Sequence, residues 1–323
     1  MKVLVGDIGG TKTLLQITEL EGNHVHIYHT ERFASNAWTG FTPLLEEFLS
    51  TTAVRPEKAC LAVAGPVDEN RARLTNLPWE DLDAISLASH FKMRSILLIN
   101  DFQAIGHGIA GLTENEFATL QEGREYLHAP RALLGAGTGL GQSILVWENG
   151  SYVPLETEGG HADFSPLNEE QDRLLQFLRI RYGHVSYERL LSGAGLVNIY
   201  QFLYSSLFPA GEPLTINATI DPAAISTAAL NTSDPIAVRS LHLFVRIYGQ
   251  QAGNLALTCL ARGGVYIAGG IAPQILSVLQ NGEFIQAFRS KGRMERLLVE
   301  IPVRVVLNPH VGLLGATIVA TRS

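Results

Sequence analysis

The chain has 323 residues, 46% of them hydrophobic, and a formal net charge of −7. Its length predicts two domains, because single hydrophobic cores seldom grow beyond ~250–300 residues. The acidic balance argues against a nucleic-acid partner, whose phosphates need a basic surface. No signal peptide or apolar stretch of about 18 residues is found. We therefore expect no membrane segment. Cys60 and Cys259 lie singly in apolar segments, so we expect free thiols and no structural zinc site. Free thiols suit a reducing compartment, and we expect a cytoplasmic protein.

Apolar periodicity predicts an α/β chain. In the N-terminal part, strands are expected over 2–8, 13–20, 24–33 and 58–65, and helices over 41–50 and 82–92. The apolar run 95–99 is typical of a parallel strand buried on both faces. Further strands are expected over 131–147, 265–268 and 301–307, and further helices from Phe102 and over 168–182, 187–193, 195–207, 235–261 and 311–322.

Two glycine-threonine loops are the most informative feature: Gly6-Asp7-Ile8-Gly9-Gly10-Thr11 and Gly135-Ala136-Gly137-Thr138-Gly139-Leu140-Gly141. Each lies between two apolar, β-branched runs, so both are expected at the tips of β-hairpins. Glycine lets successive backbone N–H groups point at one spot, which makes an anion-binding concavity. Two such tips predict a phosphate held from both sides. The short similarity between the two loop regions also indicates two related halves.

Asp7 lies where a buried strand meets the first loop. A carboxylate there can hold Mg²⁺ against phosphates, directly or through water; an aspartate that only organises the turn is the alternative. No GxxxxGK[ST] sequence is present. The segment 106–111 matches GxGxxG, but inside a helical stretch and without the acidic residue expected about 20 positions later. We interpret that segment as a site of close packing.

Asn100 and Asp101 follow the apolar run 95–99, at the carboxyl end of a predicted parallel strand. Open α/β sheets place ligand-binding groups at this edge. A carboxylate there can accept the proton of a hydroxyl nucleophile, and the neighbouring amide can orient that hydroxyl. The alternative is that the aspartate only caps the helix that follows.

Glu158-Gly159-Gly160-His161 and Glu188 suit a polyhydroxylated ligand, because carboxylates accept hydrogen bonds from adjacent hydroxyls and imidazole donates or accepts. The alternatives are a structural histidine and a glutamate that only stabilises the first turn of a helix after Ser186. Gly269-Gly270 ends an apolar strand, and flat backbone of this kind can receive an adenine ring or allow close strand–helix packing.

Together these segments resemble the bacterial glucokinases of the non-repressor branch, within the actin-like sugar kinase superfamily. The resemblance covers nearly the whole chain. The chain lacks the zinc-binding cysteine cluster of the repressor-and-kinase sister family, which favours the non-repressor branch. Lys12 departs from the Asn that relatives often have after the first loop. Besides the two glycine loops, the resemblance depends on 99–102, 158–164, 184–193 and 312–315.

The resemblance implies two actin-like (ribonuclease H-like) α/β domains flanking a cleft, a small one of residues 1–110 plus 301–323 and a large one of 111–300. It implies that Asp101 is the catalytic base and that Asp7 lies near Mg²⁺. The implied glucose ligands are Asn100, Asp101, Glu158, His161 and Glu188. The implied ATP-binding residues are Gly6, Asp7, Ile8, Gly9, Gly10, Thr11, Gly137, Thr138, Gly139, Gly269 and Gly270.

The activity implied by the resemblance is ATP-dependent phosphorylation of D-glucose to glucose 6-phosphate, with Mg²⁺, by a cytoplasmic homodimer that feeds glycolysis. Two alternatives stay open. A related kinase would act on another hexose or an N-acylated amino sugar, and a non-catalytic sugar sensor would keep the same fold for binding alone.

Overall fold

The computed structural model describes residues 1–22, 24–74, 77–207 and 221–322. The chain divides into two compact units. Unit 1 comprises Met1–Glu114, Glu148–Glu156 and Asn308–Ser323, and unit 2 comprises Asn115–Trp147 and Thr157–Leu307. The domain limits expected from the resemblance stay a prediction.

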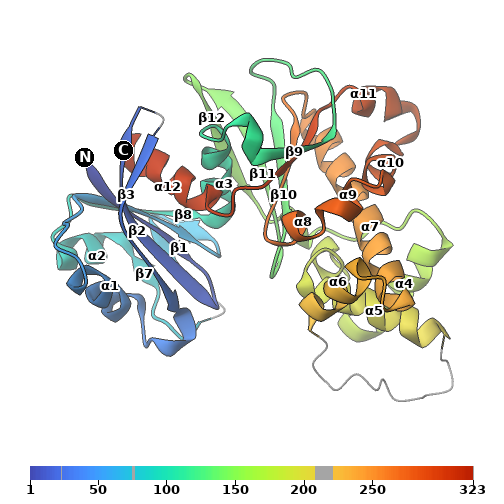
Figure 1. Ribbon diagram of the computed structural model, residues 1–323, viewed down its shortest axis with the longest axis horizontal. Helices are drawn as coiled ribbons and strands as arrows, with labels where there is room; N and C mark the ends of the chain where they lie inside the picture. Colours follow the sequence, from blue (N-terminus) through green and yellow to red (C-terminus); the bar gives the residue numbers. More distant parts are fainter. Residues whose placement is uncertain (23, 75–76, 208–220, 323) are drawn as a thin grey trace. The chain divides into compact units, whose positions relative to one another are not determined.

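A five-stranded sheet forms the centre of unit 1, in the order β3-β2-β1-β4-β8 (Figure 1). Antiparallel pairing joins β1, β2 and β3, and parallel pairing joins β1, β4 and β8. The first glycine loop is therefore a hairpin tip, as predicted. The parallel strand after Arg94 is also confirmed, but β8 is an edge strand in which only Ile96 and Leu98 are fully buried. The strand bounds are β1 Lys2–Ile8, β2 Lys12–Glu21, β3 His24–Ala34, β4 Lys58–Val63 and β8 Ser95–Asn100.

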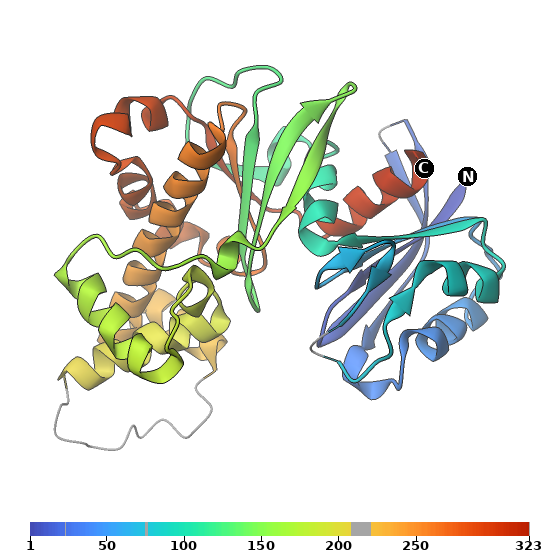
Figure 2. The same cartoon turned by 180° about the vertical axis from the view of Figure 1, so that it is seen from behind.

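Helices cover both faces of this sheet because successive residues of a strand point to opposite faces. Leu4 and Ile8 of β1 pack with α1 and α2, whereas Val3 and Val5 pack with α12. Figure 2 shows α12, in red at the C-terminus, lying against this sheet. Two-residue strands β5, β6 and β7 form a separate small sheet, for which the sequence has no clear apolar pattern. The bounds are α1 Phe41–Ser50, α2 Ala84–Phe91, α3 Asp101–Ile109, α12 Val311–Arg322, β5 Val67–Asp68, β6 Arg71–Ala72 and β7 Leu82–Asp83.

Glycines let α3 and α12 approach each other closely. A Cβ placed on Gly108 would lie 2.0 Å from the carbonyl oxygen of Val311, and one on Gly315 would lie 1.7 Å from that of Ala104. Neither position can therefore take a larger residue unless the helices separate. The interpretation of 106–111 as a close-packing segment is confirmed.

Strands β11, β10, β13 and β14 of unit 2 repeat the arrangement of unit 1, in a sheet of order β12-β11-β10-β13-β14-β9. Residues 151–156 of β12 belong to unit 1. The pair β10 and β11 is antiparallel, like β1 and β2, and β10, β13 and β14 are parallel, like β1, β4 and β8. The second glycine loop is thus also a hairpin tip, and the two sheets support the expectation of related halves. The bounds are β9 Phe117–Gln121, β10 Arg131–Ala136, β11 Leu140–Glu148, β12 Ser151–Thr157, β13 Val265–Ala268 and β14 Val303–Val306.

The helices of unit 2 gather around the long helix α7, whose Phe244, Ile247 and Tyr248 are fully buried. The helix expected over 187–193 is wrong: a single 3₁₀ turn, η4, covers Tyr187–Arg189, and α5 begins at Gly193. A second 3₁₀ turn, η3, covers Gly159–His161. The helix bounds are α4 Glu169–Tyr182, α5 Gly193–Leu207, α6 Pro222–Leu230, α7 Pro235–Cys259, α8 Ile271–Gln274, α9 Leu276–Leu279, α10 Glu283–Arg289 and α11 Glu295–Val299.

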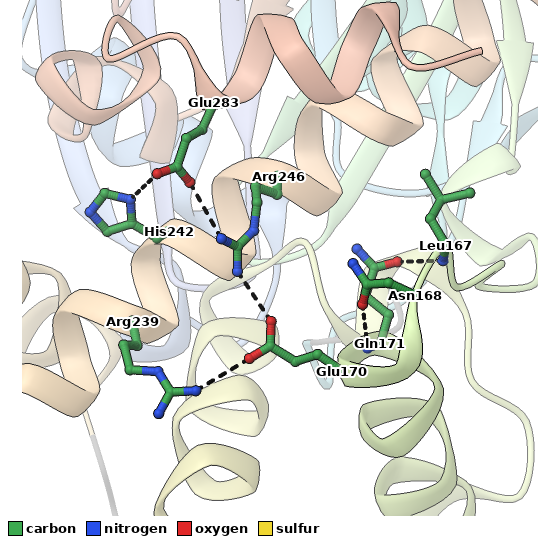
Figure 3. Close-up of polar contacts among 8 residues, drawn as sticks. All are labelled: Leu167, Asn168, Glu170, Gln171, Arg239, His242, Arg246 and Glu283. Carbon is green, nitrogen blue, oxygen red and sulfur yellow. Dashed lines mark hydrogen bonds and ion pairs between the residues drawn. The ribbon is translucent and has the colours of Figure 1, made fainter. Parts of the chain in front are cut away.

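A cluster of charged side chains joins α4, α7 and α10 (Figure 3). Glu170 bonds Arg239 and Arg246 at 3.3 and 3.2 Å, and Glu283 bonds His242 at 2.8 Å and lies 3.7 Å from Arg246. These side chains are partly exposed, so the ion pairs add modest stability and mainly set how the helices align.

The start of α4 is set by side-chain bonds. Asn168 accepts a hydrogen bond from the backbone N–H of Gln171 at 3.0 Å, and the Gln171 side chain accepts one from the N–H of Leu167 at 2.8 Å (Figure 3). This arrangement satisfies N–H groups that the first turn of a helix leaves without a partner.

The predicted α/β class is confirmed, and both cysteines are free thiols. Cys60 is buried, whereas Cys259 is only partly buried. None of the helices in the described ranges combines the length and the hydropathy needed to span a bilayer.

Candidate active site

The first glycine loop is closed by a hydrogen bond from the N–H of Gly9 to the carbonyl of Lys12, at 3.0 Å. Ser35, which is fully buried, supports the loop from a distance in sequence. Its hydroxyl donates to the carbonyl of Gly9 at 2.8 Å, and its N–H donates to that of Thr11 at 3.0 Å. Ser35 was not predicted from the sequence, because no local pattern connects it with the loop.

Asp7 lies in β1 and pairs with Leu14 of β2 and Ala62 of β4. Burial raises the pKa of its carboxyl group, and the nearby charges of Lys12 and His310 act in the opposite direction. A carboxylate at the end of a strand, next to a loop that offers backbone N–H groups, supplies an oxygen ligand of the kind that Mg²⁺ takes together with phosphates. The residues of this loop therefore fit a magnesium–phosphate group.

The register of unit 1 brings Asp7 and the 100–101 pair to the same edge of the sheet. Ile8 pairs with Val63, and Val63 pairs with Asn100, so the parallel strands end in one row. This is the carboxyl edge, where open α/β sheets bind ligands.

Asn100, not Asp101, is the N-cap of α3. The Asn100 side-chain oxygen accepts hydrogen bonds from the N–H groups of Phe102 and Gln103 at 2.9 and 3.4 Å. Its amide donates to the carbonyl of Gly65 at 3.1 Å. Asp101 is the first residue of α3, and one of its oxygens accepts from the N–H of Phe102 at 2.9 Å. The half-buried carboxylate is thus held beside the first turn of α3.

In unit 2 the structure brings Glu158, His161 and Glu188 together. Nε2 of His161 lies 3.8 Å from a carboxylate oxygen of Glu158, and Nδ1 of His161 lies 3.9 Å from one of Glu188. Glu158 and His161 are 72% and 58% exposed, so both can still meet a ligand. Gly160 lets this turn lie against β11, because a Cβ there would lie 2.0 Å from the carbonyl oxygen of Leu140.

Glu188 also contacts the second glycine loop. Its carboxylate accepts a hydrogen bond from the N–H of Leu140 at 3.0 Å, and a Cβ on Gly139 would lie 2.5 Å from the same oxygen. The loop is held further by bonds from Gly137 N–H to the Gly139 carbonyl at 2.8 Å and from Gly193 N–H to the Gly137 carbonyl at 2.9 Å. The candidate sugar ligands and the candidate phosphate loop of unit 2 are therefore neighbours.

Gly269 and Gly270 lie beside the start of this loop, because β13 is parallel to β10 and pairs Ala268 with Gly135. Gly269 has a φ of +83°, and a Cβ on it would lie 2.4 Å from the Ala136 carbonyl oxygen, so close packing requires it. Gly270 has no atom within 4 Å of its Cβ position and presents open backbone. Close packing thus accounts for Gly269 and leaves room for a ligand at Gly270.

Comparisons with known proteins identify the family. A family model described as Glucokinase matches residues 4–323. The glucokinase of Trichormus variabilis is 44% identical over 99% of this chain and 99% of its own length. That of Synechocystis is 40% identical, over 99% and 98%.

Solved structures show the same fold. A glucokinase from an Antarctic psychrotroph has a TM-score of 0.86 at 30% identity and covers 100% of this chain and 99% of its own. A ROK family glucokinase from Streptomyces griseus, solved with glucose and AMPPNP, has a TM-score of 0.67 at 21% identity, with 100% of both chains covered. These likenesses confirm the expected actin-like α/β fold. The chain belongs to the glucokinase family.

Proposed function

We propose that this protein phosphorylates D-glucose with ATP and releases glucose 6-phosphate and ADP. The observation that carries the proposal is the contact of Glu188 with both His161 and the glycine loop at Leu140. Carboxylates and an imidazole read sugar hydroxyls, and a glycine hairpin tip binds phosphate. Such a contact suits an enzyme that transfers a phosphoryl group to a sugar.

Asp101 is the proposed base. The 6-hydroxyl oxygen of glucose forms a bond to the γ-phosphorus of ATP, and the bond from that phosphorus to the β,γ-bridging oxygen breaks. The hydroxyl proton passes to the Asp101 carboxylate, and ADP leaves with the bond electrons. Asn100 is proposed to orient the hydroxyl. Its side-chain oxygen also accepts the cap bonds from Phe102 and Gln103, and these bonds hold the amide in place.

Catalysis of this kind depends on positioning and on charge stabilisation. The glycine loops at 9–11 and 137–139 are proposed to hold the phosphates through backbone N–H groups other than those of Gly9 and Gly137, which already donate to carbonyls within the loops. Gly269–Gly270 is proposed to receive the adenine. Mg²⁺, held by Asp7 directly or through water, would neutralise charge on the phosphates. Glu158, His161 and Glu188 are proposed to bind the glucose hydroxyls.

The broader assignments are also proposals. We infer domain limits of 1–110 plus 301–323 and 111–300, a homodimer, and a cytoplasmic location, all from the resemblance to bacterial glucokinases. Size-exclusion chromatography with light scattering would test the homodimer directly.

ADP release by the purified protein tests the activity, measured with ATP, Mg²⁺ and a panel of hexoses and N-acylated amino sugars. We expect rapid ADP release with glucose and much slower release with its epimers, because a wrong sugar leaves hydrogen-bonding groups of the site unpaired. Faster ADP release with another sugar would show that this sugar, and not glucose, is the substrate. Sugar binding in a calorimeter without ADP release would instead favour a sensor.

A further inference from the structure

The turn that carries Glu188 is anchored by its neighbour Tyr187. The Tyr187 side chain is 3% exposed, and its ring meets that of Phe164 edge to face at 5.6 Å. Its N–H donates to the carbonyl of Ala162 at 3.0 Å, next to His161. The position of Tyr187 therefore helps to set both sides of the candidate sugar site.

The hydroxyl of Tyr187 accepts a hydrogen bond from the side-chain amide of Asn254, at 3.0 Å. Asn254 lies on α7, and the same amide nitrogen also donates to the Gln251 side chain at 3.1 Å. An amide can face a partner with its oxygen or its nitrogen, so a bond to Tyr187 alone does not fix which way it points.

Lys291 fixes that orientation. Its ammonium group donates to the Asn254 side-chain oxygen at 2.7 Å and to the Gln250 carbonyl at 3.0 Å. Lysine has donors only, so the Asn254 oxygen must face Lys291 and its nitrogen must face Tyr187. Partial burial lowers the pKa of Lys291 to about 8, as expected for an amine that has lost part of its hydration.

Gly253 makes room for this contact. A Cβ on Gly253 would lie 2.8 Å from Cε of Lys291 and 2.5 Å from the Phe288 carbonyl oxygen. The aliphatic part of the Lys291 side chain therefore lies against α7 where Gly253 has no Cβ. The hydrogen-bonded residues Lys291, Asn254 and Tyr187, and Glu188 beside them, all lie in unit 2.

We propose that Lys291, Asn254 and Tyr187 form a hydrogen-bonded chain that positions Glu188 for sugar binding. The proposal rests on the proposed function, because it takes Glu188 as a glucose ligand. Lys291 and Asn254 are positioning residues that act through Tyr187. Loss of either end of the chain should weaken sugar binding while ATP binding is kept.

The test is calorimetric glucose binding to the full-length protein together with steady-state kinetics. Lys291→Met keeps most of the apolar stem and removes the ammonium group, and Tyr187→Phe keeps the buried ring and removes the hydroxyl. We expect each variant to raise the Kd for glucose about tenfold, with KM for ATP unchanged. In the double variant the two effects should be far from additive, because both break the same chain.

Tyr200→Phe is the matched control, because Tyr200 is a buried tyrosine of unit 2 whose hydroxyl bonds Asp234 at 2.7 Å. It should leave the Kd for glucose unchanged and add independently to Lys291→Met. An unchanged Kd in Tyr187→Phe, or additive effects of Lys291→Met and Tyr187→Phe, would overturn the proposal. If Lys291→Met does not fold, the comparison of Tyr187→Phe with Tyr200→Phe decides alone. A wild-type protein that neither binds nor phosphorylates glucose would instead refute the proposed function.

Discussion

The carboxylate of Glu188 accepts a hydrogen bond from the backbone N–H of Leu140 at 3.0 Å. One side chain therefore connects the sugar-binding candidates Glu158 and His161 with the glycine loop proposed to bind phosphate. The contact depends on the absence of a side chain at Gly139, whose Cβ position lies 2.5 Å from the same carboxylate oxygen.

Gly139→Ala should displace the Glu188 carboxylate and break its bond to Leu140. We expect KM for glucose to rise about tenfold, because a displaced acceptor no longer pairs with a sugar hydroxyl. Gly137→Ala is the steric control, since its Cβ would meet nothing within 4 Å. Although Gly137 belongs to the proposed phosphate loop, the variant should leave KM for glucose unchanged at saturating ATP. Equal KM values for glucose in the two variants would contradict the coupling.

Asp101→Asn should lower kcat by at least ~10²-fold, the usual contribution of a positioned base. The variant should keep its melting temperature, because Asn100 provides the cap of α3. Asn100→Ala should instead destabilise the protein by about 1 kcal/mol through loss of that cap. Coupled ADP assays and thermal unfolding separate the two effects, and near-normal turnover of Asp101→Asn would refute the assignment of the base.

Asp7→Asn should raise the melting temperature at neutral pH in the absence of Mg²⁺. Burial raises the pKa of Asp7 in the folded state above its value in the unfolded chain. The folded protein therefore loses stability as the pH rises from the unfolded pKa to the folded pKa. An amide removes that loss. The same variant should need more Mg²⁺ for half-maximal activity. Unfolding curves and magnesium titrations test both effects, and an unchanged magnesium requirement would remove Asp7 from the proposed metal site.

Gly108→Ala and Gly315→Ala should each destabilise the protein by about 2 kcal/mol or more, because a Cβ at either position overlaps the facing helix. Gly312→Ala is the control on α12, since its Cβ would lie 3.8 Å from Ile105, an ordinary contact distance. It should leave stability unchanged or slightly raised. Urea unfolding measures all three free energies, and similar values would show that α3 and α12 have room to adjust.

Both thiols should react slowly with iodoacetamide at pH 8 in the folded protein. Burial raises the pKa of Cys60 to about 12 and that of Cys259 to about 11, so the reactive thiolate is scarce. Denaturation should make both react fully, which mass spectrometry can count. Rapid labelling of Cys60 in the native protein would contradict its burial.

Local features were predicted well from the sequence. The bounds of β1, α1 and β13 match the expected strands and helix, because each has a clear apolar period. Both glycine loops were placed at hairpin tips, since β-branched runs flank them on both sides. The predicted helix over 187–193 was wrong because periodicity cannot distinguish one 3₁₀ turn from the start of a longer helix.

The sequence by itself determined which segments become strands and loops, and which residue types are available for phosphate and sugar chemistry. These properties depend on neighbours along the chain, through apolar period and glycine conformation. Only the tertiary structure decided that Glu188 reaches Leu140, that Ser35 supports the first loop and that Lys291 reaches Asn254. Such contacts join segments far apart in sequence, and helix and sheet packing, which no local pattern encodes, determines which of them meet.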